Sequence, residues 1–339
     1  MIDVRAKTVI RTGTAVDGAI VHAMGKLAEL SKYKVLESYV VTAIPVGATL
    51  YVAFNIRNKS SGVFVGSAVL AVDLATLEPT IVYETGEAMI DYVLDPTDGW
   101  QCLVMEARIV EIDGGKPLET VTKDLPVGLY RMSYVGKHRV AICGDDGQVA
   151  LYDKKKLTKV KVDTSEELVS LFVATTDRAY VVGSYGTFLQ GSVKSLKQVW
   201  PEGKPNPFDA DGGRIKVLSV YETKSGAVLL GGEGRAVVYD QGKVTKLGGL
   251  DDDEAGIYAM VELGGTEYWS ASGNALYIRK GTKLVKQAAE AGGYRMEADG
   301  KTLASSCGSF VYLFDGKTWM RLRININVKK LVEKLKLDF

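Results

Sequence analysis

The sequence has few residues that form crosslinks or bind transition metals. It contains three cysteines, Cys102, Cys143 and Cys307, and two histidines, His22 and His138. The cysteines lie far apart in sequence and pair with neither histidine, so neither a disulfide framework nor a zinc-ligand spacing is recognisable. We therefore expect reduced thiols, a cytoplasmic protein and no metal site.

Long apolar segments and a charge excess are also absent. No run of about 18 or more apolar residues occurs, the length that a transmembrane helix needs, so we expect no membrane span. The first residues, MIDVRAKTVIRTG, lack the apolar stretch of a signal peptide. Lysine and arginine total 42 against 41 aspartates and glutamates, a net charge of +1. This balance argues against a globally basic protein that binds nucleic acid.

What the sequence does contain is a repeat. Short apolar runs ending in aspartate recur at intervals of 40 residues, from Asp73 to Asp113 and on to Asp153. The runs are AVLAVD, RIVEID, QVALYD, AVVYD and FVYLFD, which end at Asp73, Asp113, Asp153, Asp240 and Asp315. Equivalent runs without aspartate end near Gly191 and Lys280. A period of this length indicates a solenoid, a propeller or another repeat array.

Each repeat contains four short strand patterns. A run closed by glycine precedes the aspartate run, as in RVAICGDDG and AVLLGGEG, and the two predict strands joined by a tight turn. A further strand pattern lies before this pair and another follows it, as in LYRMSYV and LTKVKV. Four short antiparallel strands per repeat are the content of one propeller blade. Helical repeats would need longer windows with helical periodicity.

The sequence therefore predicts an all-β fold, a seven-bladed β-propeller of four-stranded antiparallel blades over residues 35–323. The expected blades are 35–83, 88–123, 129–162, 168–200, 215–247, 256–287 and 294–323. Six or eight blades are alternatives, because the extension 1–34 contains AIVHAMGKLAELSKY, which fits either two further strands or a helix. The tail 324–339 contains NVKKLVEKLKLDF, whose apolar residues recur at helical spacing. We expect a C-terminal helix packed on the propeller wall, with a protruding membrane-surface or partner-binding helix as the alternative.

The repeat units resemble those of WD-repeat and related β-propellers, in which the third strand of a blade ends in aspartate. The segment AVLAVDLATLEPTIV, residues 68–82, is especially similar to the hairpins of third and fourth strands in such proteins. The Gly-His pair and the Trp-Asp dipeptide of true WD repeats are absent. The resemblance is therefore generic, and no family's functional residues can be placed on this sequence.

In a propeller the connections sort onto two faces. Links between successive blades, and turns between the second and third strands, lie on one face, here named the link face. The remaining turns lie on the opposite side, the turn face. The predicted links hold fourteen acidic residues and two lysines, whereas the predicted turn face carries many lysines. The sequence thus predicts an acidic link face and a basic turn face, a field that would steer oppositely charged partners to each side.

The link face is the predicted docking site for another, basic protein. Its longest loop, PEGKPNPFDADGG at 201–213, holds three of the eight prolines. Phe208 in this loop is either an exposed aromatic anchor or a side chain buried beneath the loop. The candidate partner-binding residues are Asp163, Glu166, Glu167, Phe208, Asp209, Asp211, Glu233, Asp251, Asp252 and Asp253.

Signs of catalysis are weak. The acidic segment GLDDDEAG, 249–256, offers oxygen ligands but lacks the alternating spacing of a calcium loop. The first strands of the blades place several polar residues in the channel, where they could act in acid–base chemistry, although every propeller channel holds some polar side chains. These residues are Asp91, Arg131, Tyr134, Tyr221, Tyr258, Glu262, Arg295 and Glu297. No Ser-His-Asp or Cys-His set is recognisable, so we assign no catalytic residue and no cofactor.

Three functions fit these features. The first is non-catalytic protein binding, in its most specific form an inhibitor or immunity-type protein that masks a basic toxin or nuclease. The second is a hydrolase or lyase at the channel mouth, with calcium as its cofactor. The third, binding of nucleic acid or anionic lipid on the lysines of the turn face, is the weakest because aromatic residues are not interleaved with them.

Overall fold

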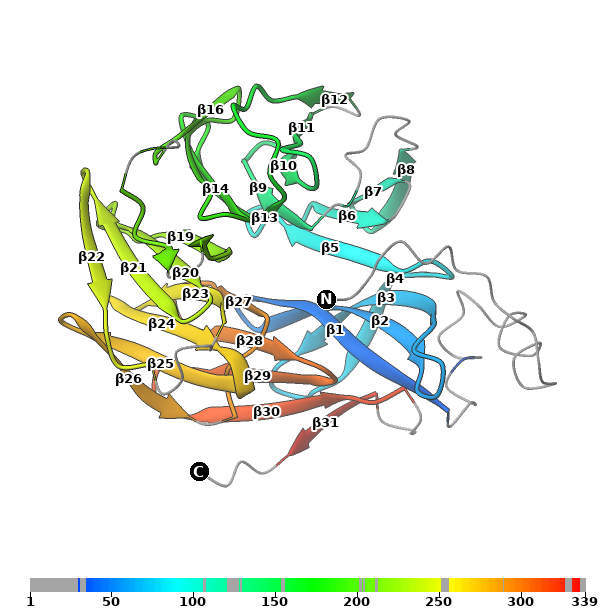
Figure 1. Cartoon of the computed structure of the whole chain (residues 1–339). Helices are drawn as coiled ribbons and strands as arrows, with labels where there is room; N and C mark the ends of the chain where they lie inside the picture. The colour runs from blue at the N-terminus through cyan, green and yellow to red at the C-terminus, as the bar shows by residue number, and fades with distance from the viewer. Residues whose placement is uncertain are drawn as a thin grey trace.

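The computed structural model describes residues 30, 35–105, 108–120, 128, 130–153, 156–200, 203, 205–210, 213–250, 256–288, 290–326 and 331–335. Seven antiparallel sheets, six with four strands and one with five, all in chain order, are arranged around one central axis (Figure 1). The fold is a seven-bladed β-propeller, as the repeat predicts.

The first four blades span residues 36–198. Blade 1 is β1 (Leu36–Val46), β2 (Thr49–Asn58), β3 (Phe64–Asp73) and β4 (Pro79–Thr85). Blade 2 is β5 (Met89–Leu94), β6 (Gln101–Met105), β7 (Ile109–Asp113) and β8 (Lys116–Thr120). Blade 3 is β9 (Arg131–Tyr134), β10 (Arg139–Cys143), β11 (Val149–Asp153) and β12 (Lys156–Lys159). Blade 4 is β13 (Leu168–Thr175), β14 (Arg178–Gly183), β15 (Phe188–Ser192) and β16 (Ser195–Gln198).

The other three blades follow a small hairpin, β17 (Asp209–Ala210) and β18 (Gly213–Arg214), in the long loop. Blade 5 is β19 (Val217–Glu222), β20 (Val228–Gly232), β21 (Arg235–Asp240) and β22 (Lys243–Leu247). Blade 6 is β23 (Ile257–Leu263), β24 (Thr266–Ala271), β25 (Ala275–Lys280) and β26 (Lys283–Ala288). Blade 7 is β27 (Arg295–Ala298), β28 (Leu303–Cys307), β29 (Phe310–Phe314) and β30 (Trp319–Ile324).

The hydrophobic core lies between neighbouring blades rather than at the axis. The second and third strands are buried on both sides, as in β2 and β3, because each sheet is covered by a blade on either side. This is why these strands appear in the sequence as continuous apolar runs. The inner strands β1, β5, β9, β13, β19, β23 and β27 surround the channel, each next to the one that follows.

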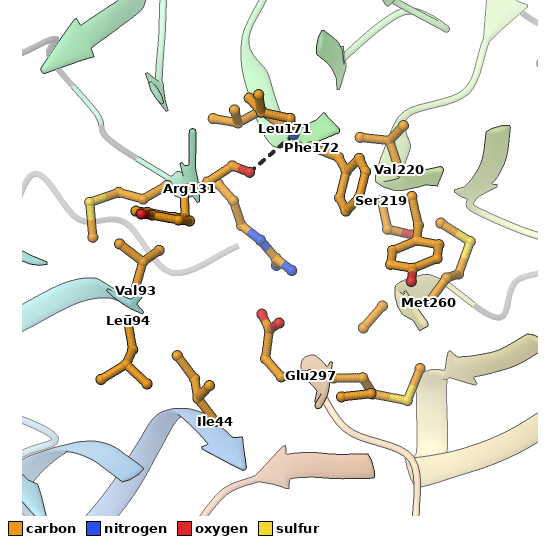
Figure 2. A pocket seen from close by; sticks show the side chains of 18 of the residues that line it. Ile44, Val93, Leu94, Arg131, Leu171, Phe172, Ser219, Val220, Met260 and Glu297 are labelled. Atoms are coloured by element: carbon orange, nitrogen blue, oxygen red, sulfur yellow. Dashed lines mark hydrogen bonds between the residues drawn. The ribbon is translucent and has the colours of Figure 1, made fainter. Parts of the chain in front are cut away.

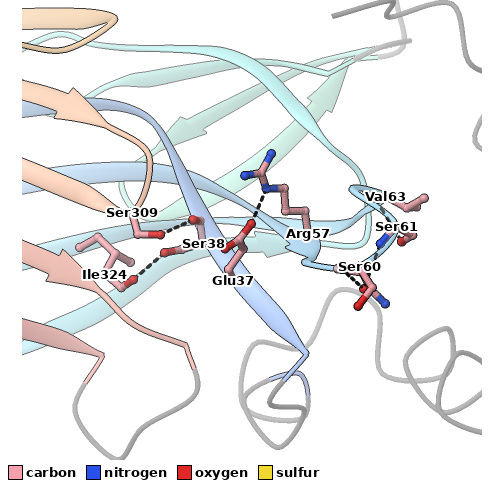
Figure 3. Close-up of polar contacts among 9 residues, drawn as sticks. Glu37, Ser38, Arg57, Ser60, Ser61, Val63, Ser309 and Ile324 are labelled. Atoms are coloured by element: carbon pink, nitrogen blue, oxygen red, sulfur yellow. Dashed lines mark hydrogen bonds and ion pairs between the residues drawn. The ribbon is translucent and has the colours of Figure 1, made fainter. Parts of the chain in front are cut away.

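The ring closes between blade 7 and blade 1. The amide of Val40 donates a hydrogen bond to the carbonyl of Gly308 at 2.6 Å. Figure 3 shows two further bonds at this seam, from Ser38 Oγ to the Ile324 carbonyl and from Ser309 Oγ to the Ser38 carbonyl. The seam therefore joins two complete blades, and neither blade borrows a strand from the other end of the chain to complete its four strands.

The described part of the C-terminal tail is a strand, so the predicted C-terminal helix is wrong there. β31 (Val332–Leu335) pairs antiparallel with β30 as a fifth strand of blade 7. Val332 is buried in the core between blades 7 and 1, where Leu30 of the N-terminal extension is also buried. The outer edge of β30 offers unpaired backbone groups, and pairing with them outweighs the helical spacing of the apolar residues.

The repeated aspartates have two structural roles. Asp73 Oδ1 accepts hydrogen bonds from the amides of Ala75 and Thr76 at 2.9 and 2.8 Å, and Asp315 does the same for its own turn. In blades 2, 3 and 5 the aspartate instead lies opposite a lysine across a two-residue turn. These pairs are Asp113–Lys116, Asp153–Lys156 and Asp240–Lys243. These pairs place acidic side chains among the lysines of the turn face, and the net basic charge of that face stays a prediction.

The two turn-capping aspartates predict an acid-sensitive fold. Backbone hydrogen bonds, chiefly from Thr76 to Asp73 and from Thr318 to Asp315, lower the pKa of both carboxyl groups. A group whose pKa is lower in the folded state stabilises the fold above its unfolded pKa of about 4, and this stability is lost as pH falls through the folded pKa. We expect the melting temperature to fall between about pH 5 and pH 2, measured by circular dichroism. The double variant Asp73→Asn/Asp315→Asn should show a shallower decrease, and an unchanged slope would contradict this assignment.

Candidate functional site

The structure places the candidate partner-binding residues on several loops of the link face. Asp163, Glu166 and Glu167 lie in the link from β12 to β13. Asp209 lies in the loop from β16 to β19, and Glu233 is exposed in the turn between β20 and β21. Four of the predicted residues lie outside the described part of the chain: Asp211, Asp251, Asp252 and Asp253.

Two of these acids are held by basic neighbours. Glu167 Oε2 lies 2.6 Å from Lys216 Nζ and accepts a hydrogen bond from Ser184 Oγ at 2.7 Å. Burial raises the pKa of Glu167, but hydrogen bonds from Lys216, Tyr130 and Ser184 outweigh it and lower the pKa overall. Asp209 is paired with Arg214 at 2.9 Å. These carboxylates hold the loops in place and are not free for a partner.

Four other carboxyl groups lie on two neighbouring loops that a backbone hydrogen bond connects. They are Asp145 and Asp146 in the turn between β10 and β11, and Asp163 and Glu166 in the following link. The amide of Gly147 donates to the carbonyl of Glu166 at 2.9 Å, which ties the turn to the link. Among the described residues, none of the four carboxylates forms an ion pair. We name these residues the acidic cluster; Asp145 and Asp146 were not among the predicted partner-binding residues.

Phe208 is buried, so the interpretation as an exposed anchor is wrong. Its side chain has no exposed surface and lies in the core cluster with Tyr180, Phe188 and Trp200, 6.3 Å from the ring centre of Trp200. The position of Phe208 explains why the second glycine of the pair in AVLLGGEG, Gly232, has no side chain. A Cβ atom on Gly232 would lie 2.9 Å from Phe208 Cε1, so glycine makes room for the ring.

The most exposed aromatic side chain among the described residues is Tyr185, in the turn between β14 and β15, ahead of Tyr294 in the link from β26 to β27. Tyr185 is 64% exposed. Its φ of 53° and the φ of 66° at Gly186 are both positive, the pattern of a type I′ turn. In blade 3 the corresponding residue is Asp146, and in blade 6 it is Gly273. Aspartate and glycine tolerate this conformation, whereas a bulky side chain is strained in it.

The turn that carries Tyr185 is bound to the links on both sides. The amide of Ser184 donates to the carbonyl of Glu167 at 2.9 Å, and the amide of Gly186 donates to the carbonyl of Ile215 at 2.8 Å. Asn206 Nδ2 also donates to the carbonyl of Gly186 at 3.0 Å. Tyr185 therefore projects from a turn held between the links on either side of blade 4. The sequence feature that could have identified Tyr185 is the Ser-Tyr-Gly turn, because the corresponding turns of blades 3 and 6 have Asp-Gly and Gly-Asn.

The channel contains a buried ion pair. Asp91 Oδ2 of β5 lies 2.8 Å from Arg295 Nη2 of β27, and the two side chains are 3% and 12% exposed. The amide of Met132 in β9 also donates to Asp91 Oδ2, at 2.6 Å. Burial raises the pKa of Asp91, and the nearby Arg295 opposes that rise. This carboxylate thus links blades 2, 3 and 7, and it is a structural group rather than a free catalytic one.

Residues of all seven inner strands line a cavity of about 270 Å³ in the channel. Four of the predicted channel residues line it: Arg131, Tyr134, Tyr221 and Glu297. In Figure 2, Arg131 and Glu297 point into the cavity from different blades, with apolar side chains such as Leu94 and Phe172 around them. Burial raises the pKa of Glu297 to about 7, against the attraction of Arg295. Of the remaining predicted residues, Glu262 accepts a hydrogen bond from the amide of Lys224 at 2.8 Å, and Tyr258 packs on Tyr294.

The turn face brings together one group of possible metal ligands. Ligand atoms of Asp95, Asp98 and His138 lie within 4.8 Å of one another, and such oxygen and nitrogen donors suit zinc and related ions. They also bind one another, because His138 Nε2 lies 2.6 Å from Asp98 Oδ2. Tyr134 donates its hydroxyl to Asp95. The sequence expectation overlooked this group, although Asp98 and His138 are 40 residues apart, one repeat.

Comparisons with solved structures support the assignment of the fold. The chain is similar to the WD40 β-propeller domain of Doa1, with a TM-score of 0.63 and 12% identity, over 84% of this chain and 99% of that one. Its fold is a WD40-like β-propeller. Within the described part of the propeller, no helix has the length and apolar character to cross a membrane.

The propeller is similar to other solved structures at equally low identity. YCF48 bound to D1 peptide matches with a TM-score of 0.59 and 11% identity, over 81% of this chain and 93% of that one. The extracellular domain of a protein named as one-component system BT4673, from B. thetaiotaomicron, matches with a TM-score of 0.59 and 14% identity. That match covers 88% of this chain and only 46% of the BT4673 chain. No family model and no curated protein matches the sequence. At these identities the likeness concerns the fold alone.

Proposed function

We propose that this propeller binds an arginine-containing segment of another protein on the link face of blades 3 and 4. The observation that carries the proposal is Tyr185, which is 64% exposed on a turn whose backbone disfavours it. Strained residues that the surroundings hold in place are concentrated at functional sites. A rigid, exposed tyrosine is also a preferred anchor at protein interfaces, because little entropy is lost when it is covered.

The turn that carries Tyr185 and the turn that carries Asp146 are both bound to the link between blades 3 and 4. One link joins them, since Gly147 donates to the carbonyl of Glu166 and Ser184 donates to the carbonyl of Glu167. A guanidinium group could therefore stack on the Tyr185 ring while neighbouring basic groups meet Asp146 and Asp163. YCF48 bound to D1 peptide supports the proposal as an example of this fold with a bound peptide.

An inhibitor or immunity-type protein that masks a basic toxin or nuclease is the most specific form of this proposal. Such a protein holds its target with a Kd of about a nanomole per litre or less. A weaker, salt-sensitive complex would instead indicate a transient adaptor. The cytoplasmic location suggested by the three thiols stays a prediction.

Titration of a labelled, arginine-rich peptide in a Gly-Ser background tests the binding. We expect Tyr185→Gly to weaken it about tenfold or more, which corresponds to about 1.4 kcal/mol, without loss of stability. Gln241→Gly is the matched control, because Gln241 also has a positive φ, 47°, but lies in the turn between β21 and β22, on the turn face. Reversal of charge in Asp146→Lys/Asp163→Lys should also weaken binding and reduce its dependence on salt. Equal binding by wild type and Tyr185→Gly would refute the proposal.

A further inference from the structure

The channel cavity contains one basic and one acidic side chain that face each other. Arg131 belongs to β9 in blade 3, and Glu297 belongs to β27 in blade 7. Figure 2 shows their charged ends pointing toward one another across the cavity. Among the described residues, neither side chain has a hydrogen bond or an ion pair. The cavity thus presents a basic and an acidic group, neither of which forms a direct bond with a described side chain, although Arg295 lies near enough to attract Glu297.

The buried charges of Asp91 and Arg295 neutralise each other, whereas Asp299 lies at the mouth of the cavity. Asp91 and Arg295 form an ion pair at 2.8 Å, and the amide of Met132 donates a further hydrogen bond to Asp91. A purely anionic ligand would be repelled by Glu297 once this group ionises, and a purely cationic ligand would be repelled by Arg131. A ligand that carries both charges can satisfy both ends at once.

The walls and the size of the cavity restrict the ligand further. Ile44, Leu94, Phe172 and Met260 line it with apolar surface. Its volume of about 270 Å³ is just below the range of about 300–1,000 Å³ that is typical of sites for drug-sized ligands. The cavity therefore suits a metabolite with a small apolar side chain, to which a flexible methionine can adapt.

We propose that the channel cavity binds a free α-amino acid with an apolar side chain. The guanidinium of Arg131 would hold the carboxylate through paired hydrogen bonds, and the carboxylate of Glu297 would accept hydrogen bonds from the ammonium group. Pro45, Pro96 and Asp299 line the cavity at the ends of their inner strands, so it opens on the turn face. This site is separate from the proposed protein-binding surface, and either can exist without the other.

Calorimetric titration of the wild-type protein with L-leucine, L-methionine and L-phenylalanine tests the proposal. Two analogues of leucine each remove one charge: leucinamide lacks the carboxylate, and N-acetyl-leucine lacks the ammonium group. We expect at least one of the three amino acids to bind and, with leucine as the reference zwitterion, each analogue to bind at least tenfold more weakly. Binding of leucine should also strengthen from about pH 6 to about pH 8 as Glu297 ionises.

Substitutions assign each end of the ligand to its residue. Arg131→Gln should abolish the preference for leucine over leucinamide, and Glu297→Gln should abolish both the preference over N-acetyl-leucine and the pH dependence. Arg323→Gln and Glu78→Gln, at exposed positions in blades 7 and 1, are the controls and should bind as the wild type does. The proposal is overturned if none of the three amino acids binds, or if both analogues bind as tightly as leucine, which would indicate an unspecific apolar cavity. The analogue series needs no variant, so it remains decisive even if a substitution prevents folding.

Discussion

Replacement of Phe208 with alanine is expected to destabilise the fold by about 3–5 kcal/mol, the usual cost of deleting a buried aromatic ring. The ring is fully buried between blades 4 and 5, among Tyr180, Phe188 and Trp200. The loop around it is also fixed, because Ile215 donates to the carbonyl of Phe208, and Arg235 Nη1 donates to the carbonyl of Pro207 at 2.8 Å. The loop has little freedom to collapse into the cavity that the substitution leaves. Urea denaturation followed by tryptophan fluorescence measures this loss.

Two variants control for the location of Phe208. Phe208→Leu keeps most of the apolar volume, so it should cost less, about 1.5 kcal/mol. Tyr185→Ala removes an exposed ring from the same face and should change stability by about 0.5 kcal/mol or less. If Phe208→Ala instead left stability unchanged and weakened peptide binding, Phe208 would be the exposed anchor that the structure excludes.

The second large effect is expected at the ion pair in the channel. Asp91→Ala leaves the Arg295 guanidinium, 12% exposed, without its carboxylate, and it removes the acceptor for the amide of Met132. Loss of one partner from a buried pair costs about 3–5 kcal/mol, because the remaining charge stays desolvated. Thermal and urea unfolding should both show this loss.

The double variant Asp91→Leu/Arg295→Met separates charge from packing. Apolar side chains of similar volume often replace a buried pair at little cost. We therefore expect the double variant to recover most of the stability lost in Asp91→Ala. If it is as unstable as the single variant, the lost bond to Met132, rather than the unpaired charge, is responsible.

The architecture was predictable because its signals are local and repeated. Turn glycines and apolar runs recur in every blade, and an aspartate marks the end of the third strand in five of the seven. The strands of one repeat can therefore be assigned by comparison with the others. The tail 324–339 is not repeated, so its predicted structure cannot be checked against a second copy. Its apolar spacing predicts a helix, whereas Val332–Leu335 pair with β30. An available sheet edge cannot be read from the sequence of the tail itself.

The sequence by itself determined the propeller architecture and the four-stranded blades and favoured seven of them, because strand alternation and tight turns depend on neighbouring residues. Only the tertiary structure decided which charges are neutralised and which aromatic ring is exposed. Glu167 and Lys216 are 49 residues apart, yet their charged atoms lie 2.6 Å from each other. Phe208 and Tyr185 both lie in polar connections, but one fills the space above Gly232 and the other projects into solvent. Burial and ion pairing are properties of contacts between blades, which no single repeat contains.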